Sequence, residues 1–118
     1  MVSTTIQKHI EKEIRDFVEV LREENLPIDS VYLFGSYARG NPRKWSDIDV
    51  CVISPQFKDS FDATQYLWQK RRKHSTPVIE PIGMSAEDFA EDTTLTREIK
   101  RHGIEVPLLR GSDFQTTE

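Results

Sequence analysis

The chain has 118 residues, a length that suits a single domain over residues 1–118 rather than a multidomain enzyme. Hydrophobic residues make up 36% and charged residues 31%, which is too apolar for a disordered polar chain, so we expect one globular core. The formal net charge of −4 gives no overall positive field that would hold a nucleic-acid backbone. We therefore expect no direct nucleic-acid binding.

Cysteine usage and hydropathy indicate the compartment. The single cysteine, Cys51, has no partner for a disulfide within the chain, and there is no charged-then-apolar leader and no run of about 18 apolar residues. These features predict a cytoplasmic protein that does not enter a membrane. Cys51 lies in an apolar segment, so we expect an inert core thiol. His74 and His102 have no Cys or His at ligand spacing, which argues against a zinc site.

The first predicted element is a helix. Apolar residues recur every three or four positions with charged residues between them, which predicts an amphipathic helix over about residues 4–25. The expected capping residues are Ser3, Thr4 or Thr5, and the expected stop signals are Asn25 and Pro27.

Short apolar runs and turns follow this helix. Val31–Phe34 predicts a buried strand that ends at Gly35, and residues 35–42 predict a tight turn, about one helical turn and a loop. Asp47–Ile53 predicts a second strand. Further along, the sequence predicts a helix over 59–70 and a strand over 77–82, and the proline in that strand places it at a sheet edge. Short helices are predicted from about 85 and over 95–101. A strand over 104–109 and a polar tail over 111–118 complete the chain.

This order of elements predicts the fold class. Helices and strands alternate in a pattern that is typical of an α/β (α+β) fold, with a small mixed β-sheet flanked by helices. The core of the domain is expected over about residues 28–110.

Two acidic residues indicate a cation site. Asp47 and Asp49 are two positions apart on a predicted strand, so their carboxylates leave the same face with Cα atoms about 7 Å apart. Two such carboxylates repel each other and lose hydration unless a cation or an arginine neutralises them. Mg²⁺ suits them because it prefers oxygen ligands and binds through one or two carboxylates together with substrate phosphates. The structural alternative is that Asp47 caps a turn after Ser46 while Asp49 pairs with Arg39 or Arg43.

A glycine and a serine indicate a phosphate site. Gly35 and Ser36 directly follow the first predicted strand, where a turn exposes backbone N–H groups and a hydroxyl to phosphate oxygens. Asn41 and Pro42 stand where a P-loop needs Lys and Ser or Thr, so a Walker-type NTPase is rejected.

Arginine and aromatic side chains near these motifs are further candidates. The guanidinium groups of Arg39 and Arg43 match phosphate geometry, with an ordinary surface role as the alternative. Four aromatic residues are candidates for stacking a base, although their spacing favours a place in the core: Tyr37, Trp45, Tyr66 and Trp68.

Taken together, the two motifs resemble the signature of a known family. Gly-Ser-Tyr-Ala-Arg-Gly at 35–40, followed by Ser-Asp-Ile-Asp-Val at 46–50, is similar to the signature of the polymerase-β-like nucleotidyltransferases, and most of all to their minimal, stand-alone members. The resemblance implies a palm-like fold in which Mg²⁺ joins a nucleoside triphosphate to Asp47 and Asp49. It places the terminal phosphates at Gly35 and Ser36. We also count Ser46, the first residue of the second motif, among the predicted nucleotide-binding residues.

The resemblance also implies a third carboxylate on the next strand. Glu80 is the acid on the predicted strand 77–82, and we assign it to this metal-binding and catalytic position. The family more commonly has Asp there, and the alternative for Glu80 is an ordinary edge-strand residue. In two-metal phosphoryl transfer the ions clamp the attacking and leaving oxygens, and a third carboxylate helps to deprotonate the attacking hydroxyl.

The function that the resemblance implies is transfer of a nucleoside monophosphate, AMP from ATP, to a hydroxyl acceptor with one or two Mg²⁺ ions. Stand-alone members are often antitoxins of helical HEPN-type ribonuclease toxins, and some attach AMP to a tyrosine of that partner. Two alternatives stay open: a module of the same fold that neutralises a partner by binding alone, and a small-molecule nucleotidyltransferase of the antibiotic-modifying kind. Self-association is also left open.

Overall fold

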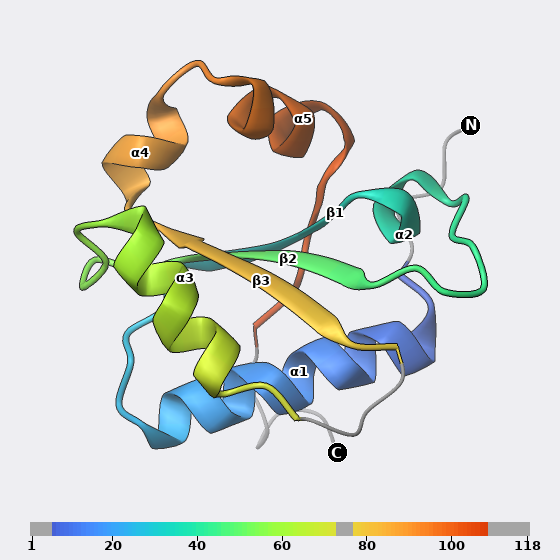
Figure 1. Cartoon of the computed structure of the whole chain (residues 1–118), viewed down its shortest axis with the longest axis horizontal. Coiled ribbons are helices and arrows are strands. Elements are labelled where there is room, and N and C mark those ends of the chain that lie inside the picture. The colour runs from blue at the N-terminus through green and yellow to red at the C-terminus, as the bar shows by residue number, and fades with distance from the viewer. Residues whose placement is uncertain (1–5, 73–76, 109–118) are drawn as a thin grey trace.

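The computed structural model describes residues 6–72 and 77–108. Its elements are α1 (Lys8–Glu23), β1 (Ser30–Phe34), α2 (Ser36–Arg39), β2 (Ile48–Ile53), α3 (Ser60–Gln69), β3 (Ile79–Met84), α4 (Ala86–Ala90), α5 (Thr94–His102) and β4 (Ile104–Glu105). The strands form one sheet in the order β3-β2-β1-β4 (Figure 1). Strand β2 is antiparallel to β1 and parallel to β3, while β4 is antiparallel to β1. The predicted mixed sheet with flanking helices is thus confirmed.

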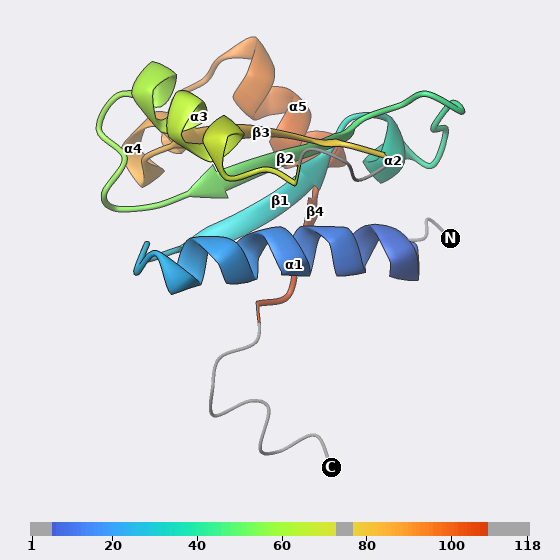
Figure 2. The same ribbon diagram turned by 60° about the horizontal axis from the view of Figure 1, so that its bottom comes forward.

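The sheet separates two layers of helices. Helices α1 and α3 pack on one face of the sheet, and α4 and α5 pack on the other. Helix α1 runs along one side of the sheet, with α4 and α5 on the opposite side (Figures 1 and 2). Because side chains alternate along a strand, Val50 and Val52 of β2 join the core against α1 and α3, whereas Cys51 and Ile53 join a smaller core with Ile99 of α5. Cys51 is fully buried and burial raises the pKa of its thiol to about 12, which fits the predicted inert core role.

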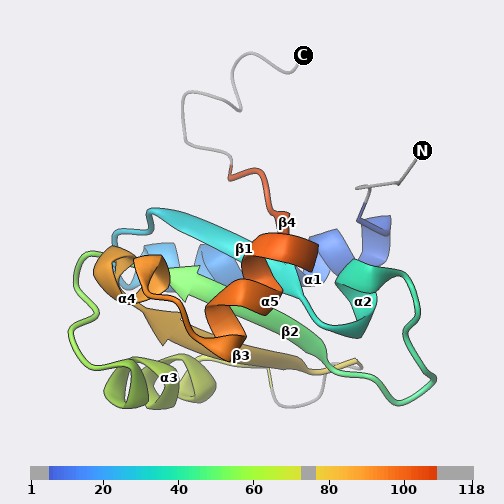
Figure 3. The same cartoon turned by 90° about the horizontal axis from the view of Figure 1, so that it is seen from above.

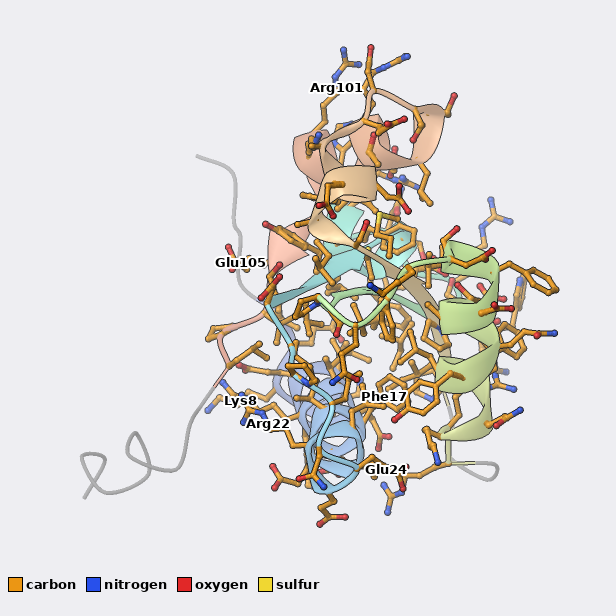
Figure 4. The ribbon with its side chains drawn as sticks, turned by 90° about the vertical axis from the view of Figure 1, so that its left-hand side faces the viewer. Lys8, Phe17, Arg22, Glu24, Arg101 and Glu105 are labelled. Carbon is orange, nitrogen blue, oxygen red and sulfur yellow. The ribbon has the colours of Figure 1, made fainter. Side chains whose placement is uncertain are left out.

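Helix α1 carries the predicted apolar stripe, and Phe17 points from it into the space shared with α3 and the sheet (Figure 4). The buried residues of the stripe are Ile10, Ile14, Phe17, Val18 and Leu21. The helix begins at Lys8 with Gln7 as a non-bonding N-cap, and the expected caps at 3–5 lie outside the described residues. It ends at Glu23 with Glu24 as its C-cap, and the predicted stop residue Asn25 follows with a φ of +65°, which lets the chain leave the last turn.

The predicted bounds of β2, β3 and β4 differ from the structure. Asp47 lies one residue before β2 rather than within it. Strand β3 covers Ile79–Met84 instead of 77–82, although it does lie at the predicted edge of the sheet. Strand β4 has two residues instead of the predicted 104–109, because Pro107 has no N–H to continue the pairing with β1.

Local capping residues set the ends of the later helices. Asp59 caps α3 by accepting hydrogen bonds from the backbone N–H groups of Phe61 and Asp62, and Ser85 caps α4. Gly103 is the C-cap of α5, where the helix stops. The predicted polar tail at 111–118 lies outside the described residues. Over residues 6–72 and 77–108, no helix combines the length and the apolar character needed to cross a membrane.

Helix α3 packs against β3 at Gly83, where there is no room for a side chain. A Cβ atom added there would lie 2.9 Å from Cβ of Ala63 and 3.0 Å from Cδ1 of Leu67. We expect Gly83→Ala to lower the free energy of unfolding by about 1–3 kcal/mol, because overpacking a closed core forces the helix away from the sheet. Urea denaturation measures this loss. In an Ala63→Gly background the same change should cost less, and an equal cost in both backgrounds would contradict the close packing.

Candidate active site

Strand pairing brings the two sequence motifs to one end of the sheet. In the register of β1 with β2, Phe34 lies opposite Asp49, and in the register of β2 with β3, Asp49 lies opposite Glu80. The three residues therefore form one row across neighbouring strands. By alternation along β2, Asp49 is on the same face as Cys51 and Ile53, the face that α4 and α5 cover further along the strands. The candidate site lies at the β2 N-terminus, next to α2 (Figure 1).

Gly35 places the backbone of the first motif directly against Asp49. A Cβ atom at Gly35 would lie 2.1 Å from Oδ2 of Asp49, and the φ of Gly35 is +75°. Both facts exclude a side chain at this position. Helix α2 starts at Ser36, and the amides of Ala38 and Arg39 both donate to the carbonyl of Gly35 at 3.1 Å. The predicted turn with one short helical segment is confirmed, and it shares a small space with the Asp49 carboxylate.

Asp49 lies in a cluster of negative charge. Its partial burial is the largest cause that raises its pKa to about 7, and a hydrogen bond with Glu80 and the charges of Glu80 and Asp47 raise it further, while Arg39 opposes them. Two carboxyl groups can share a hydrogen bond only when one of them carries a proton. These surroundings favour the neutral form of Asp49 in the metal-free protein, and a bound cation would favour its charged form instead.

The oxygen ligands of this cluster suit Mg²⁺. Mg²⁺ commonly uses one or two protein carboxylates and takes its other ligands from water and substrate phosphates. Asp49 and Glu80 are in contact, whereas Asp47 is exposed and precedes the strand. Within the described ranges, no three Asp, Glu, His or Cys side chains converge closely enough to enclose a metal ion by themselves. The structure thus brings two of the three predicted carboxylates together, and the site fits an ion that phosphate oxygens help to hold.

The three other predicted nucleotide-binding residues take different positions. Arg39, at the end of α2, is close enough to Asp49 to influence its charge and forms an ion pair with Glu98 of α5. Arg43 and Ser46 bond to each other: Ser46 Oγ accepts from the Arg43 amide at 2.8 Å, and the Ser46 amide donates to the Arg43 carbonyl at 3.0 Å. These two residues close a turn before Asp47. Among the described residues, Asp49 forms no ion pair with either arginine, unlike in the structural alternative.

The aromatic residues divide into two groups. Tyr37 and Tyr66 pack against the main core, as their spacing favours. The expectation of a core position is wrong for Trp45, whose exposed fraction is 75%, and for Trp68, whose exposed fraction is 40%. Trp45 belongs to the loop before Asp47, outside the sheet. Trp68 lies on α3, where its Nε1 donates to the Pro81 carbonyl of β3 at 3.0 Å.

Glu98 is the residue near the site that sequence reasoning missed. It lies far along the chain from both motifs, and nothing in its local sequence distinguishes it from a solvated helix residue. Only the packing of α5 on the sheet brings it to Arg39.

The close contact at Gly35 can be separated from backbone strain by comparing two glycines. Gly35 and Gly40 both have positive φ, +75° and +78°, but nothing lies within 4 Å of a Cβ atom added at Gly40. We expect Gly40→Ala to cost about 1 kcal/mol of stability and to leave the site intact. Gly35→Ala should also displace the Asp49 carboxylate and weaken binding of Mg²⁺ and nucleotide at least about tenfold, as measured by titration calorimetry. Equal binding by both variants would contradict the site geometry.

The raised pKa of Asp49 predicts a pH-dependent stability of the metal-free protein. The folded pKa of about 7 lies above the ordinary value of 3.8, so between these values the folded state holds a proton that the unfolded state releases. Stability should therefore fall as the pH rises from about 4 to 7. Asp49→Asn lacks this loss and should gain about 1–2 kcal/mol relative to wild type between pH 5 and pH 8, after discounting for solvent screening. Urea denaturation of both proteins in EDTA at pH 5 and pH 8 measures this difference in stability. If the stability of wild type and of Asp49→Asn changed equally with pH, the predicted cluster of negative charge around Asp49 would be contradicted.

Comparisons with known proteins agree with this site. The family model described as a nucleotidyltransferase domain matches residues 14–105. A relative from Methanocaldococcus jannaschii, named as a proposed protein adenylyltransferase, is 35% identical over 65 residues, which cover 48% of this chain and 76% of the relative.

Solved structures show the same fold. A proposed nucleotidyltransferase from Sulfolobus solfataricus superposes with a TM-score of 0.58 at 21% identity, over 82% of this chain and 78% of that one. A chain of a toxin–antitoxin complex with AMP-PNP gives a TM-score of 0.53 at 22% identity, over 89% of this chain and 78% of its own. A chain of a variant MntA–HpeT toxin–antitoxin complex gives 0.53 at 23%, over 85% and 76%. From its motifs, its fold and the family match over most of its length, the chain belongs to the nucleotidyltransferase domain family.

Proposed function

We propose that this protein transfers AMP from ATP to a hydroxyl group of a partner protein in a Mg²⁺-dependent reaction. The observation that carries the proposal is the contact of Gly35, Asp49 and Glu80 at one end of the sheet. The name of the Methanocaldococcus jannaschii relative supports AMP transfer to a protein, and the neighbour crystallised with AMP-PNP supports a nucleoside triphosphate as the donor.

Each residue of the site has a role in this reaction. Asp49 and Glu80 would hold Mg²⁺, with Asp47 as the third carboxylate at the open side, and the ion would neutralise triphosphate charge. Gly35 and Ser36 would bind terminal phosphates with backbone and hydroxyl groups. Three residues would contact the nucleotide more peripherally: Arg39, Arg43 and Ser46.

The chemical step is an exchange at the α-phosphate. The acceptor hydroxyl oxygen forms a bond to the α-phosphorus, the bond from that phosphorus to the bridging oxygen breaks, and pyrophosphate leaves. The hydroxyl proton would pass to the carboxylate of Glu80, which lies opposite Asp49 on β3. A carboxylate within reach of the attacking hydroxyl can act as a general base in this step.

A macromolecular acceptor suits the openness of the site. Asp47 is exposed, and a cavity of about 470 Å³ lies at the opposite end of the sheet, lined by residues such as Leu26, Phe57 and Tyr66. No carboxylate of the candidate site lines that cavity. Small-molecule acceptors are usually bound in enclosed pockets, so this arrangement favours an acceptor that brings its own surface. The toxin–antitoxin neighbours support a toxin protein as that partner, and the resemblance in sequence supports a HEPN-type ribonuclease.

The test is incubation of the purified protein with ATP, Mg²⁺ and a candidate HEPN-type ribonuclease, followed by intact-mass measurement of both chains. We expect the partner to gain the mass of AMP with wild type and to gain none with Asp49→Asn. Glu80→Gln should keep most of its ATP affinity in titration calorimetry but transfer AMP at least about 100-fold more slowly, because a proton acceptor acts mainly in the transition state.

Other outcomes would decide against the proposal in distinct ways. Stable binding of the partner without a mass change would favour the binding module. Equal ATP affinity with Mg²⁺ and with EDTA would contradict the metal site. Transfer by Glu80→Gln at the wild-type rate would show that Glu80 is an ordinary edge-strand residue.

A further inference from the structure

The ion pair of Arg39 joins the candidate site to the second helical layer. Nη1 of Arg39 donates to Oε2 of Glu98, and this is the ion pair that Arg39 forms within the described part of the chain. Helices α2 and α5 lie beside each other near the end of β1 (Figure 3). The Arg39 amide donates to the carbonyl of Gly35, the residue that packs against the Asp49 carboxylate, yet the Arg39 side chain is held by Glu98, which lies outside the carboxylate cluster.

The two ends of this ion pair are anchored very differently. Glu98 is next to Ile99, which is 1% exposed in the core between α5 and the sheet. The N-terminus of α5 is secured by a capping box between Thr93 and Thr96, and Thr96 is 3% exposed. Arg39, in contrast, ends a helix of four residues, none of which is buried. Glu98 is therefore the better anchored side chain of this ion pair.

We propose that Glu98 is a positioning residue that holds Arg39 away from Asp49 and Glu80, an inference that rests on the proposed function. A long, exposed arginine beside a pair of carboxylates would otherwise be attracted onto them. Such a contact would neutralise the carboxylates that Mg²⁺ requires and would occupy the guanidinium that phosphate requires. Glu98 keeps the guanidinium of Arg39 away from the carboxylates of Asp49 and Glu80 until the metal and the nucleotide bind.

The geometry favours positioning over competition between Glu98 and phosphate. A guanidinium has five N–H donors in a fixed plane, and Glu98 engages a single nitrogen of Arg39. The remaining donors stay available for phosphate oxygens. Holding the side chain in place before binding also reduces the loss of rotamer freedom when the nucleotide binds.

The test uses Glu98→Gln, which keeps the size of the side chain and removes its charge. We expect the nucleotide-free variant to bind Mg²⁺ about three- to tenfold more weakly in titration calorimetry, and to bind ATP with Mg²⁺ more weakly by a similar factor. The matched control is Asp92→Asn, which removes the 2.7 Å ion pair of Asp92 with Arg97 on the same helix. That variant should bind Mg²⁺ and ATP as wild type does.

A double variant shows whether Glu98 acts through Arg39. Arg39→Gln combined with Glu98→Gln should regain wild-type affinity for Mg²⁺, because no arginine remains to occupy the carboxylates. A purely structural role of Glu98 would give no such rescue, and failure of the rescue would overturn the inference. Tighter ATP binding by Glu98→Gln would also overturn it, since Glu98 would then be a competitor.

Failure of the inference can be distinguished from failure of the proposed function. If Arg39→Gln weakens ATP binding while Glu98→Gln changes neither Mg²⁺ nor ATP affinity, the role of Glu98 is wrong and the proposed function stands. If wild type binds no ATP, the proposed function is wrong, and the Mg²⁺ titrations still decide whether Glu98 keeps Arg39 off the carboxylates.

Discussion

The antiparallel pairing of β1 with β2 is the constraint on which the site depends. This register carries the end of β1 to the beginning of β2, so the turn at Gly35 meets the carboxylate of Asp49. The parallel neighbour β3 then adds Glu80 to the same row. A shift of one residue in either register would turn the affected side chains to the opposite face, because alternation along a strand has a period of two. The position of the chemistry is therefore a property of the sheet.

The cost of gathering carboxylates is offset elsewhere in the fold. The larger core, between α1, α3 and the sheet, contains many fully buried aliphatic side chains and no residue of the carboxylate cluster. The ion pair of Lys70 with Glu24, at 3.0 Å, joins the ends of α3 and α1, where Glu24 lies close to α3 (Figure 4). A local excess of negative charge can persist where the surrounding core is stable enough to offset the repulsion between the carboxylates. Such unfavourable clusters of charge are concentrated at functional sites.

Sequence patterns predicted the elements whose signals are local. The apolar stripe of α1 and the short helical turn after β1 depend on neighbours within about one helical turn, and both are confirmed. Predictions of burial were wrong where packing between segments distant in the sequence determines whether a side chain is exposed. Trp45 is a large aromatic residue of a type that is often buried. The loop that carries it projects beyond the sheet, so its side chain is exposed to solvent.

The sequence by itself determined the order of helices and strands, the two motifs and the presence of carboxylate ligands for a metal ion, because these depend only on residue type and spacing. Only the tertiary structure decided which of these groups meet. Asp49 and Glu80 are in contact while Asp47 remains exposed, and Glu98 reaches Arg39 from a helix that no motif marks. The physical reason is that contacts between residues distant in sequence depend on strand register and on how helices pack across the sheet, and neither is encoded in any single local segment.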